Sequence, residues 1–393
     1  MQQLDVKNAF LHEDPKEEVY MELPPGFEEQ LGKGKVCKLK KSLYGLKQSP
    51  RAWFEKFSDS IKSMGYTQGQ TDYTMFYKHS HEGKITILIV YVDDIILTGN
   101  DEHEIRRMKE SLAQKFEIKD LGNLRYFLGI EVARSKKGIF LTQRKFTLDI
   151  LKETGMLGCK PVDTPVDANF KLRTSSSVKE VNRERYQKLV GKLIYLSHTR
   201  PDIAFAVSLV SQFMHSPNED HLQAVFRILR YLKGSPGKGL LFTKQDQPLT
   251  IEAFTDADWA SSVDDRRSTS GYCTFLGGNL ITWRSKKQVV VARSSAEAEF
   301  RSVALGICEL VWIKSLMKEL RMTTEFPMKL YCDNKAAVSI AHNPVQHDRT
   351  KHVEIDRHFI KEKIENGLVC MTYISSHEQL ADVLTKGLPR QQF

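Results

Sequence analysis

The sequence predicts a multidomain chain in which an α+β segment, a helical segment and an α/β layer segment follow one another. Three observations support this prediction. Strands and helices mix before residue 144, helical periodicity follows up to the Gly/Pro-rich residues 234–239, and strands then alternate with helices. A chain of 393 residues is long enough for two or three separate cores. We therefore divide it into residues 1–144, 145–247 and 248–393.

Composition and charge are those of a globular protein with a polyanionic partner. Hydrophobic residues make up 41% and charged residues 27% of the chain, which are ordinary values. The 58 Lys and Arg residues exceed the 49 Asp and Glu residues, and the net charge of +9 favours a partner such as nucleic acid. The six cysteines are scattered singly, which indicates a reducing compartment and no disulfide framework.

Secretion and membrane insertion are not expected. No signal peptide opens the sequence. The longest apolar stretch, residues 85–97, is too short for a membrane span and contains two aspartates.

The first segment is expected to mix helices and strands. Apolar residues at helical spacing after Pro50 predict a helix. Two apolar runs flank Asp93 and Asp94 and predict a β-hairpin with the acids at its tip, where carboxylates can hold divalent metal against phosphate. The other expected elements are a helix at 102–116 and strands at 126–132 and 138–141.

The middle segment reads as helical. Apolar residues recur at positions i, i+3, i+4 and i+7 from Tyr186, and a similar stripe starts at Leu222. Asn218 is expected to cap the second of these helices, and residues 234–237 are expected to end it.

The last segment alternates strands with helices, which predicts a mixed α/β layer fold. The expected elements are strands at 249–256, 271–276, 279–283 and 289–292, a helix at 296–320, a strand at 328–332, helices at 335–342 and 353–366, a strand at 368–374 and a helix at 378–385.

Four acids of the last segment come from four separate expected elements. Asp256 and Asp333 end strands, Glu297 begins the long helix, and Asp382 lies in the last helix. Each alone is explained as a cap. Together they are expected to converge beside the strand ends, where close carboxylates raise one another's pKa. Two divalent cations about 4 Å apart would relieve that repulsion. Mg²⁺ suits a set of hard oxygen ligands, with Mn²⁺ as a possible substitute.

Short motifs surround these acids. They include Phe254-Thr255-Asp256-Ala257-Asp258, Ser294-Ser295-Ala296-Glu297-Ala298-Glu299, Tyr331-Cys332-Asp333-Asn334, Arg349-Thr350-Lys351-His352 and Gln379-Leu380-Ala381-Asp382-Val383-Leu384-Thr385-Lys386. In order and spacing they resemble the ribonuclease H domain of copia-type LTR retrotransposons. That resemblance implies a ribonuclease H-like mixed sheet in which Asp256, Glu297, Asp333 and Asp382 carry the metal ions. Glu299 is a rival to Glu297, and His377 resembles the loop histidine that assists product release.

The first segment carries three further motifs, which are Gln3-Leu4-Asp5-Val6-Lys7-Asn8-Ala9-Phe10-Leu11, Leu43-Tyr44-Gly45-Leu46-Lys47-Gln48-Ser49-Pro50-Arg51-Ala52-Trp53 and Tyr91-Val92-Asp93-Asp94. They resemble the reverse transcriptase palm of the same elements. The resemblance implies that Asp5, Asp93 and Asp94 hold metal ions for nucleotidyl transfer. It also implies nucleic-acid contacts from Gly45, Lys47, Gln48 and Tyr91.

The middle segment is similar to the thumb-connection region of these elements, through Tyr186-Gln187-Lys188-Leu189-Val190-Gly191 and Thr199-Arg200-Pro201-Asp202-Ile203-Ala204. Arg227 and Arg230 share one side of the predicted thumb helix and are expected to bind phosphate without sequence preference. A lysine cluster could do the same or be a solvated charged face; its members are Lys33, Lys35, Lys38, Lys40 and Lys41.

The resemblance implies a reverse transcriptase/ribonuclease H fragment that acts on RNA–DNA hybrids, RNA templates and DNA primers. Other Pol parts, such as integrase and capsid, are implied as partners, in cytoplasmic particles or the nucleus. Only four residues precede Asp5, where the family has its fingers, and Glu13 and Pro15 depart from the family pattern. We therefore expect impaired polymerase activity and retained Mg²⁺-dependent cleavage of the RNA strand. The alternative is a catalytically silent nucleic-acid-binding scaffold.

Overall fold

The computed structural model describes residues 1–12, 17–27, 32, 34–168, 171–174, 179, 181–244, 249–342 and 354–393. The motif Arg349-Thr350-Lys351-His352 and the positions Glu13, Pro15 and Lys33 lie outside the described residues. The chain forms two compact units, Met1–Leu124 and Arg125–Phe393.

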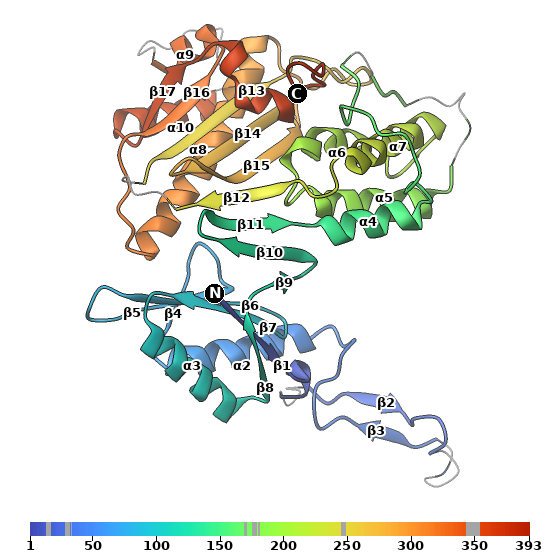
Figure 1. The fold of residues 1–393 in the computed structure, drawn as a ribbon, viewed down its shortest axis with the longest axis vertical. Helices are drawn as coiled ribbons and strands as arrows, with labels where there is room; N and C mark the ends of the chain where they lie inside the picture. Colours follow the sequence, from blue (N-terminus) through green and yellow to red (C-terminus); the bar gives the residue numbers. More distant parts are fainter. Residues whose placement is uncertain are drawn as a thin grey trace. The chain divides into compact units, whose positions relative to one another are not determined.

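The first unit is built on a six-stranded antiparallel sheet with the strand order β4-β5-β6-β7-β1-β8 (Figure 1). The strands are β1 (Gln2–Val6), β4 (Thr67–Gln68), β5 (Met75–His79), β6 (Ile85–Tyr91), β7 (Asp94–Gly99) and β8 (Ile118–Asn123). Two helices, α2 (Ser49–Ser63) and α3 (Glu102–Lys115), share one apolar core with the sheet. A short turn η1 (Ala9–His12) and a hairpin of β2 (Tyr20–Glu22) and β3 (Val36–Lys38) complete the unit.

Apolar residues at every second position give the sheet of the first unit one buried face, against which its helices pack. Every second residue of β6 and β7 is buried, and Leu88, Val90, Ile95 and Leu97 pack with Trp53 of α2 in the core. The expected helix after Pro50, the hairpin and the helix at 102–116 are confirmed.

The second unit contains a four-stranded antiparallel sheet with the order β12-β11-β10-β9. Its strands are β9 (Tyr126–Phe127), β10 (Ile130–Ser135), β11 (Gly138–Thr142) and β12 (Gly239–Thr243). The sequence division placed residues 126–141 with the first segment. They cluster with the second unit because β11 pairs with the distant β12 along its whole length.

Four helices of the second unit enclose one apolar core: α4 (Arg144–Glu153), α5 (Arg183–Leu196), α6 (Ala204–Ser211) and α7 (Glu219–Gly234). The predicted stripes are confirmed, because Tyr186 and Leu189 of α5 and Val225 and Leu229 of α7 are buried in this core. Asn218 caps α7 as expected: its side chain accepts a hydrogen bond from the backbone N–H of His221.

The last sheet of the second unit is mixed, with the order β15-β14-β13-β16-β17 (Figure 1). Its strands are β13 (Ile251–Ala257), β14 (Thr269–Leu276), β15 (Asn279–Lys287), β16 (Met328–Cys332) and β17 (Val369–Tyr373). The first three pair antiparallel, whereas β16 and β17 continue from β13 in parallel. Helices α8 (Ser295–Glu319), α9 (Lys335–His342) and α10 (Glu354–Glu365) share its core. Three antiparallel strands followed by two parallel strands and their helices form the expected ribonuclease H-like layer.

Two expected elements of this region are wrong. Residues 289–292 are not a strand, because the chain leaves the sheet after Lys287 and turns toward the start of α8. The expected helix at 378–385 consists of two 3-10 turns, η4 (Ser376–Glu378) and η5 (Leu380–Leu384). None of the helices in the described ranges combines the length and apolarity needed to span a bilayer.

Candidate active sites

The end of β13 positions Asp256 in the middle of the mixed sheet, between β14 and β16. Its side chain is buried, with 2% of the residue exposed. The Ser302 hydroxyl of α8 donates to the backbone carbonyls of Asp256, at 2.8 Å, and of Gly271, at 3.0 Å. These contacts fix the end of β13 against α8. The Thr385 hydroxyl donates to Oδ2 of Asp256 and orients the carboxylate.

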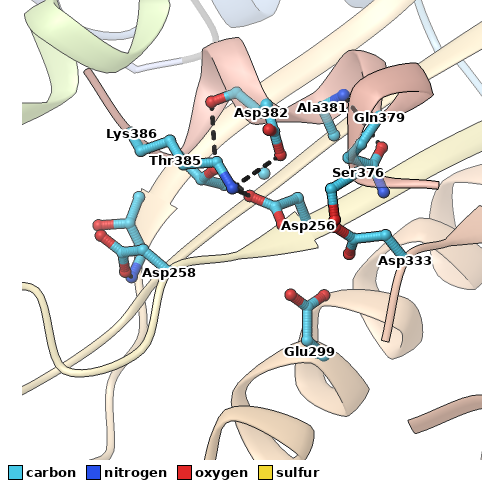
Figure 2. A network of polar contacts seen from close by, with 12 residues as sticks. Asp256, Asp258, Glu299, Asp333, Ser376, Gln379, Ala381, Asp382, Thr385 and Lys386 are labelled. Atoms are coloured by element: carbon cyan, nitrogen blue, oxygen red, sulfur yellow. Dashed lines mark hydrogen bonds and ion pairs between the residues drawn. The ribbon is translucent and has the colours of Figure 1, made fainter. Parts of the chain in front are cut away.

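Asp333 and Asp382 meet Asp256 at the same edge of the sheet. Asp333 follows β16, which is parallel to β13, so the carboxyl ends of the two strands are neighbours. Asp382 belongs to η5, and Gln379 anchors that turn by donating from Nε2 to the Thr255 carbonyl at 2.9 Å. One carboxylate oxygen from each aspartate lies within 4.8 Å of the others. Figure 2 shows the three side chains together at this edge of the sheet. The expected convergence of these three acids is therefore present.

Glu299, and not Glu297, is the fourth acid that faces this cluster (Figure 2). Burial first, and then the charges of Asp256 and Asp333, raise the pKa of Glu299 to about 10. Glu297 instead accepts a hydrogen bond from the Arg293 backbone N–H at 2.8 Å and pairs with Arg301 at 3.0 Å. The structure thus turns Glu299 toward the cluster and Glu297 away from it, and which of the two binds metal stays a prediction.

Helix geometry explains this difference. Ser294 caps α8, accepting a hydrogen bond from the Glu297 N–H, so Glu297 is the third helical residue and its side chain reaches back to the backbone. Two residues along a helix rotate the side chain by about 200°, so Glu297 and Glu299 cannot face the same cluster. The Ser294–Glu297 spacing is a capping signal that was readable in the sequence.

Sequence reasoning assigned no role to Lys386 and Thr385. The Lys386 ammonium lies 2.9 Å from Oδ1 of Asp382 and 3.6 Å from Oδ2 of Asp256. Burial and the charge of Asp256 raise the pKa of Asp382 to about 6, although the nearby Lys386 ammonium acts to lower it. Asp258 lies apart from the cluster (Figure 2) and accepts a hydrogen bond from the Thr269 backbone.

The expected loop histidine, His377, lies in η4 and is exposed. Its neighbour Ser376 donates to Oδ2 of Asp333 at 2.7 Å. His377 and Asp382 line one cavity with Gln379. The structure therefore places His377 beside the carboxylate cluster, on a turn that is hydrogen-bonded to one of its members.

In the first unit, Asp5 and Asp94 are direct partners across β1 and β7. Oδ1 of Asp94 accepts a hydrogen bond from Nε2 of Gln3 at 3.0 Å. Asp93 lies in the turn, where its carbonyl accepts from the Val6 N–H at 2.8 Å. Both groups of three potential metal ligands that are found within the described ranges lie in the second unit. Asp5, Asp93 and Asp94 are thus neighbours on the sheet but not a gathered cluster.

The nucleic-acid residues expected in the first unit are accessible. Tyr91 is 54% exposed, and Lys47 and Gln48 are exposed at the start of α2. Gly45 has a φ of 95°, a conformation that favours glycine. The preceding Tyr44 packs against Phe10 in a tilted arrangement, with ring centroids 4.4 Å apart and ring planes at 44°. Burial, and then the charges of Asp93 and Asp5, raise the pKa of Tyr44, so its ring lies beside the acids.

Arg227 and Arg230 of α7 make contacts within the second unit. Arg227 donates to Oγ1 of Thr164 at 3.0 Å and pairs with Asp167 at 3.7 Å. Arg230 donates to the Lys160 carbonyl at 3.0 Å. These contacts occupy part of each guanidinium, and phosphate binding by them stays a prediction.

Residues 1–168 match the family model described as "Reverse transcriptase (RNA-dependent DNA polymerase)". The whole chain is 46% identical over 393 residues to the "Retrovirus-related Pol polyprotein from transposon RE1" of Arabidopsis thaliana and covers 27% of that protein. It is 32% identical over 312 residues, 78% of this chain, to a "Putative transposon Ty5-1 protein" of Saccharomyces cerevisiae, which it covers completely (100%). The chain thus spans about a quarter (27%) of the Arabidopsis Pol polyproteins that it matches.

Solved structures resemble the chain only weakly. The crystal structure of LC11-RNase H1 in complex with RNA/DNA hybrid aligns with a TM-score of 0.27 and 15% identity, over 35% of this chain and 94% of that one. A foamy viral protease-reverse transcriptase in complex with ds DNA aligns with a TM-score of 0.23 and 12% identity, over 99% of this chain and 61% of that one.

Proposed function

Because the chain belongs to the reverse transcriptase family of copia-type retrotransposon Pol polyproteins, we propose that its second unit cleaves the RNA strand of RNA–DNA hybrids. The carboxylate cluster of Asp256, Glu299, Asp333 and Asp382 carries this proposal. Asp256, Asp333 and Asp382 gather at the edge of the mixed sheet, and Glu299 of α8 faces Asp256 and Asp333. Structural caps do not need such a gathering, whereas hydrolysis of a phosphodiester at a metal centre does.

The donor set fits two Mg²⁺ ions, or Mn²⁺ in their place. All four side chains offer hard carboxylate oxygens. Burial and mutual repulsion raise the pKa of Glu299 to about 10, so the metal-free site holds a proton there that divalent cations would displace. When bound, divalent metal would activate a water and stabilise the leaving 3′-oxygen of the cleaved RNA.

The chain's own residues hold the carboxylates in place. Thr385 orients Asp256 and Ser376 orients Asp333 through hydroxyl hydrogen bonds. Asp382 lies in the turn η5, and the hydrogen bond from Gln379 to the Thr255 carbonyl attaches this turn to β13. His377, beside Ser376, is positioned to meet the product as it leaves. Such contacts preorganise a charged site, which is how proteins stabilise phosphoryl transfer.

For the first unit we propose nucleotidyl transfer by Asp5, Asp93 and Asp94, with an RNA template and a DNA primer contacted by Tyr91, Gly45, Lys47 and Gln48. The opposed positions of Asp5 and Asp94 on β1 and β7 support this. Because the three acids are not gathered as the second cluster is, we expect primer extension to be weak beside hybrid cleavage. Primer extension on an RNA template tests it, and robust incorporation of nucleotides would contradict the expectation.

The functional regions are proposed as a palm in residues 1–144, a thumb-connection in 145–247 and a ribonuclease H-like domain in 248–393. The net charge of +9 supports a nucleic-acid substrate. Integrase and capsid parts of the polyprotein are the further partners we propose. Cytoplasmic particles or the nucleus are the proposed location.

Cleavage of a labelled RNA–DNA hybrid in Mg²⁺ tests the proposal for the second unit. We expect the wild-type chain to cut the RNA strand and leave a 3′-hydroxyl. The Asp256→Asn variant should cleave the hybrid at least about 100-fold more slowly than wild type. Such a loss of cleavage rate exceeds what removal of an outer-shell partner of a metal typically costs. Asp149→Asn, an exposed change on α4, is the matched control and should cleave normally. If wild type and Asp256→Asn bind the hybrid equally and neither cuts it, the chain is a silent nucleic-acid-binding scaffold.

A further inference from the structure

Lys386 is a cation built into the carboxylate cluster. Of the four acids, Asp256 and Asp382 are the two whose oxygens lie within 4.0 Å of the Lys386 ammonium, at 3.6 and 2.9 Å. Glu299 and Asp333 lie on the other side of Asp256 (Figure 2). The cluster therefore has one half that already contains a positive charge and one half that does not.

The backbone around Lys386 is fixed by close packing on both sides. Thr385 is fully buried, and a Cβ on Gly271 of β14 would lie 2.6 Å from its Cγ2 atom. A Cβ on Gly387 would lie 2.9 Å from the carbonyl oxygen of Asp167. The Asp382 carbonyl accepts from the N–H groups of both Thr385 and Lys386, each at 3.1 Å. The backbone of Lys386 is therefore held in place, and only rotations within its side chain change the position of the ammonium.

A neighbouring cavity gives that ammonium a second position. Lys386 lines a cavity of about 370 Å³ together with Asp258, Ser262 and Asp265. Asp258 is a half-buried carboxylate, and Asp265 already pairs with Lys287 at 2.9 Å. A four-carbon stem can swing into this polar space without moving the fixed backbone. Ammonium and divalent metal cannot share the gap between Asp256 and Asp382, because like charges at such a distance repel strongly.

We propose that Lys386 is a positioning residue that holds the Asp256–Asp382 half of the cluster until a second divalent ion displaces its ammonium into the adjacent cavity. This inference rests on the proposed function of the cluster as a metal centre. Metal loading is then sequential. The half formed by Glu299, Asp333 and Asp256 fills first, and the half that contains Lys386 fills at higher metal concentration.

The test is Mn²⁺ binding to the full chain carrying Asp93→Asn and Asp94→Asn, which remove two proposed metal ligands of the first unit. Free Mn²⁺ is measured by electron paramagnetic resonance without any substrate, and this chain serves as wild type for the variants below. Wild type should bind one Mn²⁺ tightly and a second more weakly. Lys386→Met, which removes the charge but keeps the stem, should tighten the second site at least tenfold. Lys386→Arg keeps the charge and should leave the second site weak. Lys109→Met, in the first unit, removes a lysine from a different aspartate, Asp120, whose Oδ2 lies 2.7 Å from the Lys109 ammonium; it is the matched control, with wild-type binding expected.

Circular dichroism of each variant checks folding, and Lys386→Gln replaces Lys386→Met if that variant is unfolded. A second-site affinity within twofold of wild type in the folded, charge-free variant overturns the role of Lys386 and leaves the metal centre intact. If wild type and every variant, including Asp256→Asn, lack saturable Mn²⁺ binding, the proposed metal centre itself is refuted.

Discussion

Trp53 donates its indole N–H to the carbonyl oxygen of Val92, with 2.7 Å between Nε1 and the oxygen. Val92 has a φ of 55°, which is unusual for a β-branched residue. The hydrogen bond thus ties α2 to a strained turn, and the next residue, Asp93, is one of the proposed metal ligands. Holding an unfavourable backbone conformation in this way is typical of functional sites.

Replacement of Trp53 by Phe should lower the free energy of unfolding by about 1–2 kcal/mol, because the Val92 carbonyl loses its partner while the aromatic packing is largely kept. Urea denaturation followed by circular dichroism measures this. Phe54→Leu, on the same helix without this contact, is the control. An unchanged unfolding free energy for Trp53→Phe would show that the hydrogen bond does not hold the turn.

Substitution of Glu299 should impair metal binding and cleavage, whereas substitution of Glu297 should affect only stability. Glu299→Gln removes one acid from the cluster and should abolish tight Mn²⁺ binding and reduce hybrid cleavage at least about 100-fold. Glu297→Gln loses its ion pair with Arg301 and should cost up to about 1 kcal/mol of stability, with cleavage retained. Cleavage assays and thermal denaturation of both variants decide this. The reverse pattern would restore Glu297 as the ligand.

Alanine substitutions at Gly271 and Gly306 compare overpacking next to the carboxylate cluster with overpacking in the core of the same sheet. A Cβ at Gly271 would approach Thr385, and a Cβ at Gly306 would lie 2.5 Å from Cγ2 of Thr255. Both Gly→Ala variants should lose about 1–3 kcal/mol of stability through overpacking. Gly271→Ala should also weaken Mn²⁺ binding, because Thr385 orients Asp256. Equal Mn²⁺ affinities in the two variants would mean that Thr385 does not position the carboxylate.

The stability of the second unit should fall at acidic pH through His221. Burial lowers its pKa below 6.5, against smaller opposing effects of the Arg173 carbonyl, Asp220 and Asp264. Nδ1 accepts from the Asn218 N–H at 3.1 Å, so the folded state needs a neutral ring. The unfolded chain therefore binds the proton more readily than the folded chain. The contribution of neutral His221 to the free energy of unfolding is complete above pH 6.5 and is lost as the pH falls below that value.

Urea denaturation at pH 7.5 and pH 5.0 measures the effect of His221. His221→Gln can still accept the capping hydrogen bond but cannot titrate, so the loss of stability between the two pH values should be smaller than in wild type. An equal loss in wild type and His221→Gln would assign the pH dependence to other groups.

Local sequence patterns were sufficient for most elements and for three of the four clustered acids. Helical stripes and period-two alternation report which face of an element is apolar, and this determined α2, α5, α7 and the β6–β7 hairpin. Acids at the carboxyl ends of two paired parallel strands lie at one sheet edge, which makes Asp256 and Asp333 neighbours.

Only the tertiary structure decided features that depend on which distant surfaces meet. The pairing of β11 with β12 joins residues about a hundred positions apart, and no local pattern specifies that partner. Lys386 meets Asp256 because Thr385 and Gly387 pack against distant segments, 271 and 167 among them. Glu299 faces the cluster because of the rotation of α8 about its axis, which the packing of its whole apolar face against β13 and β14 determines.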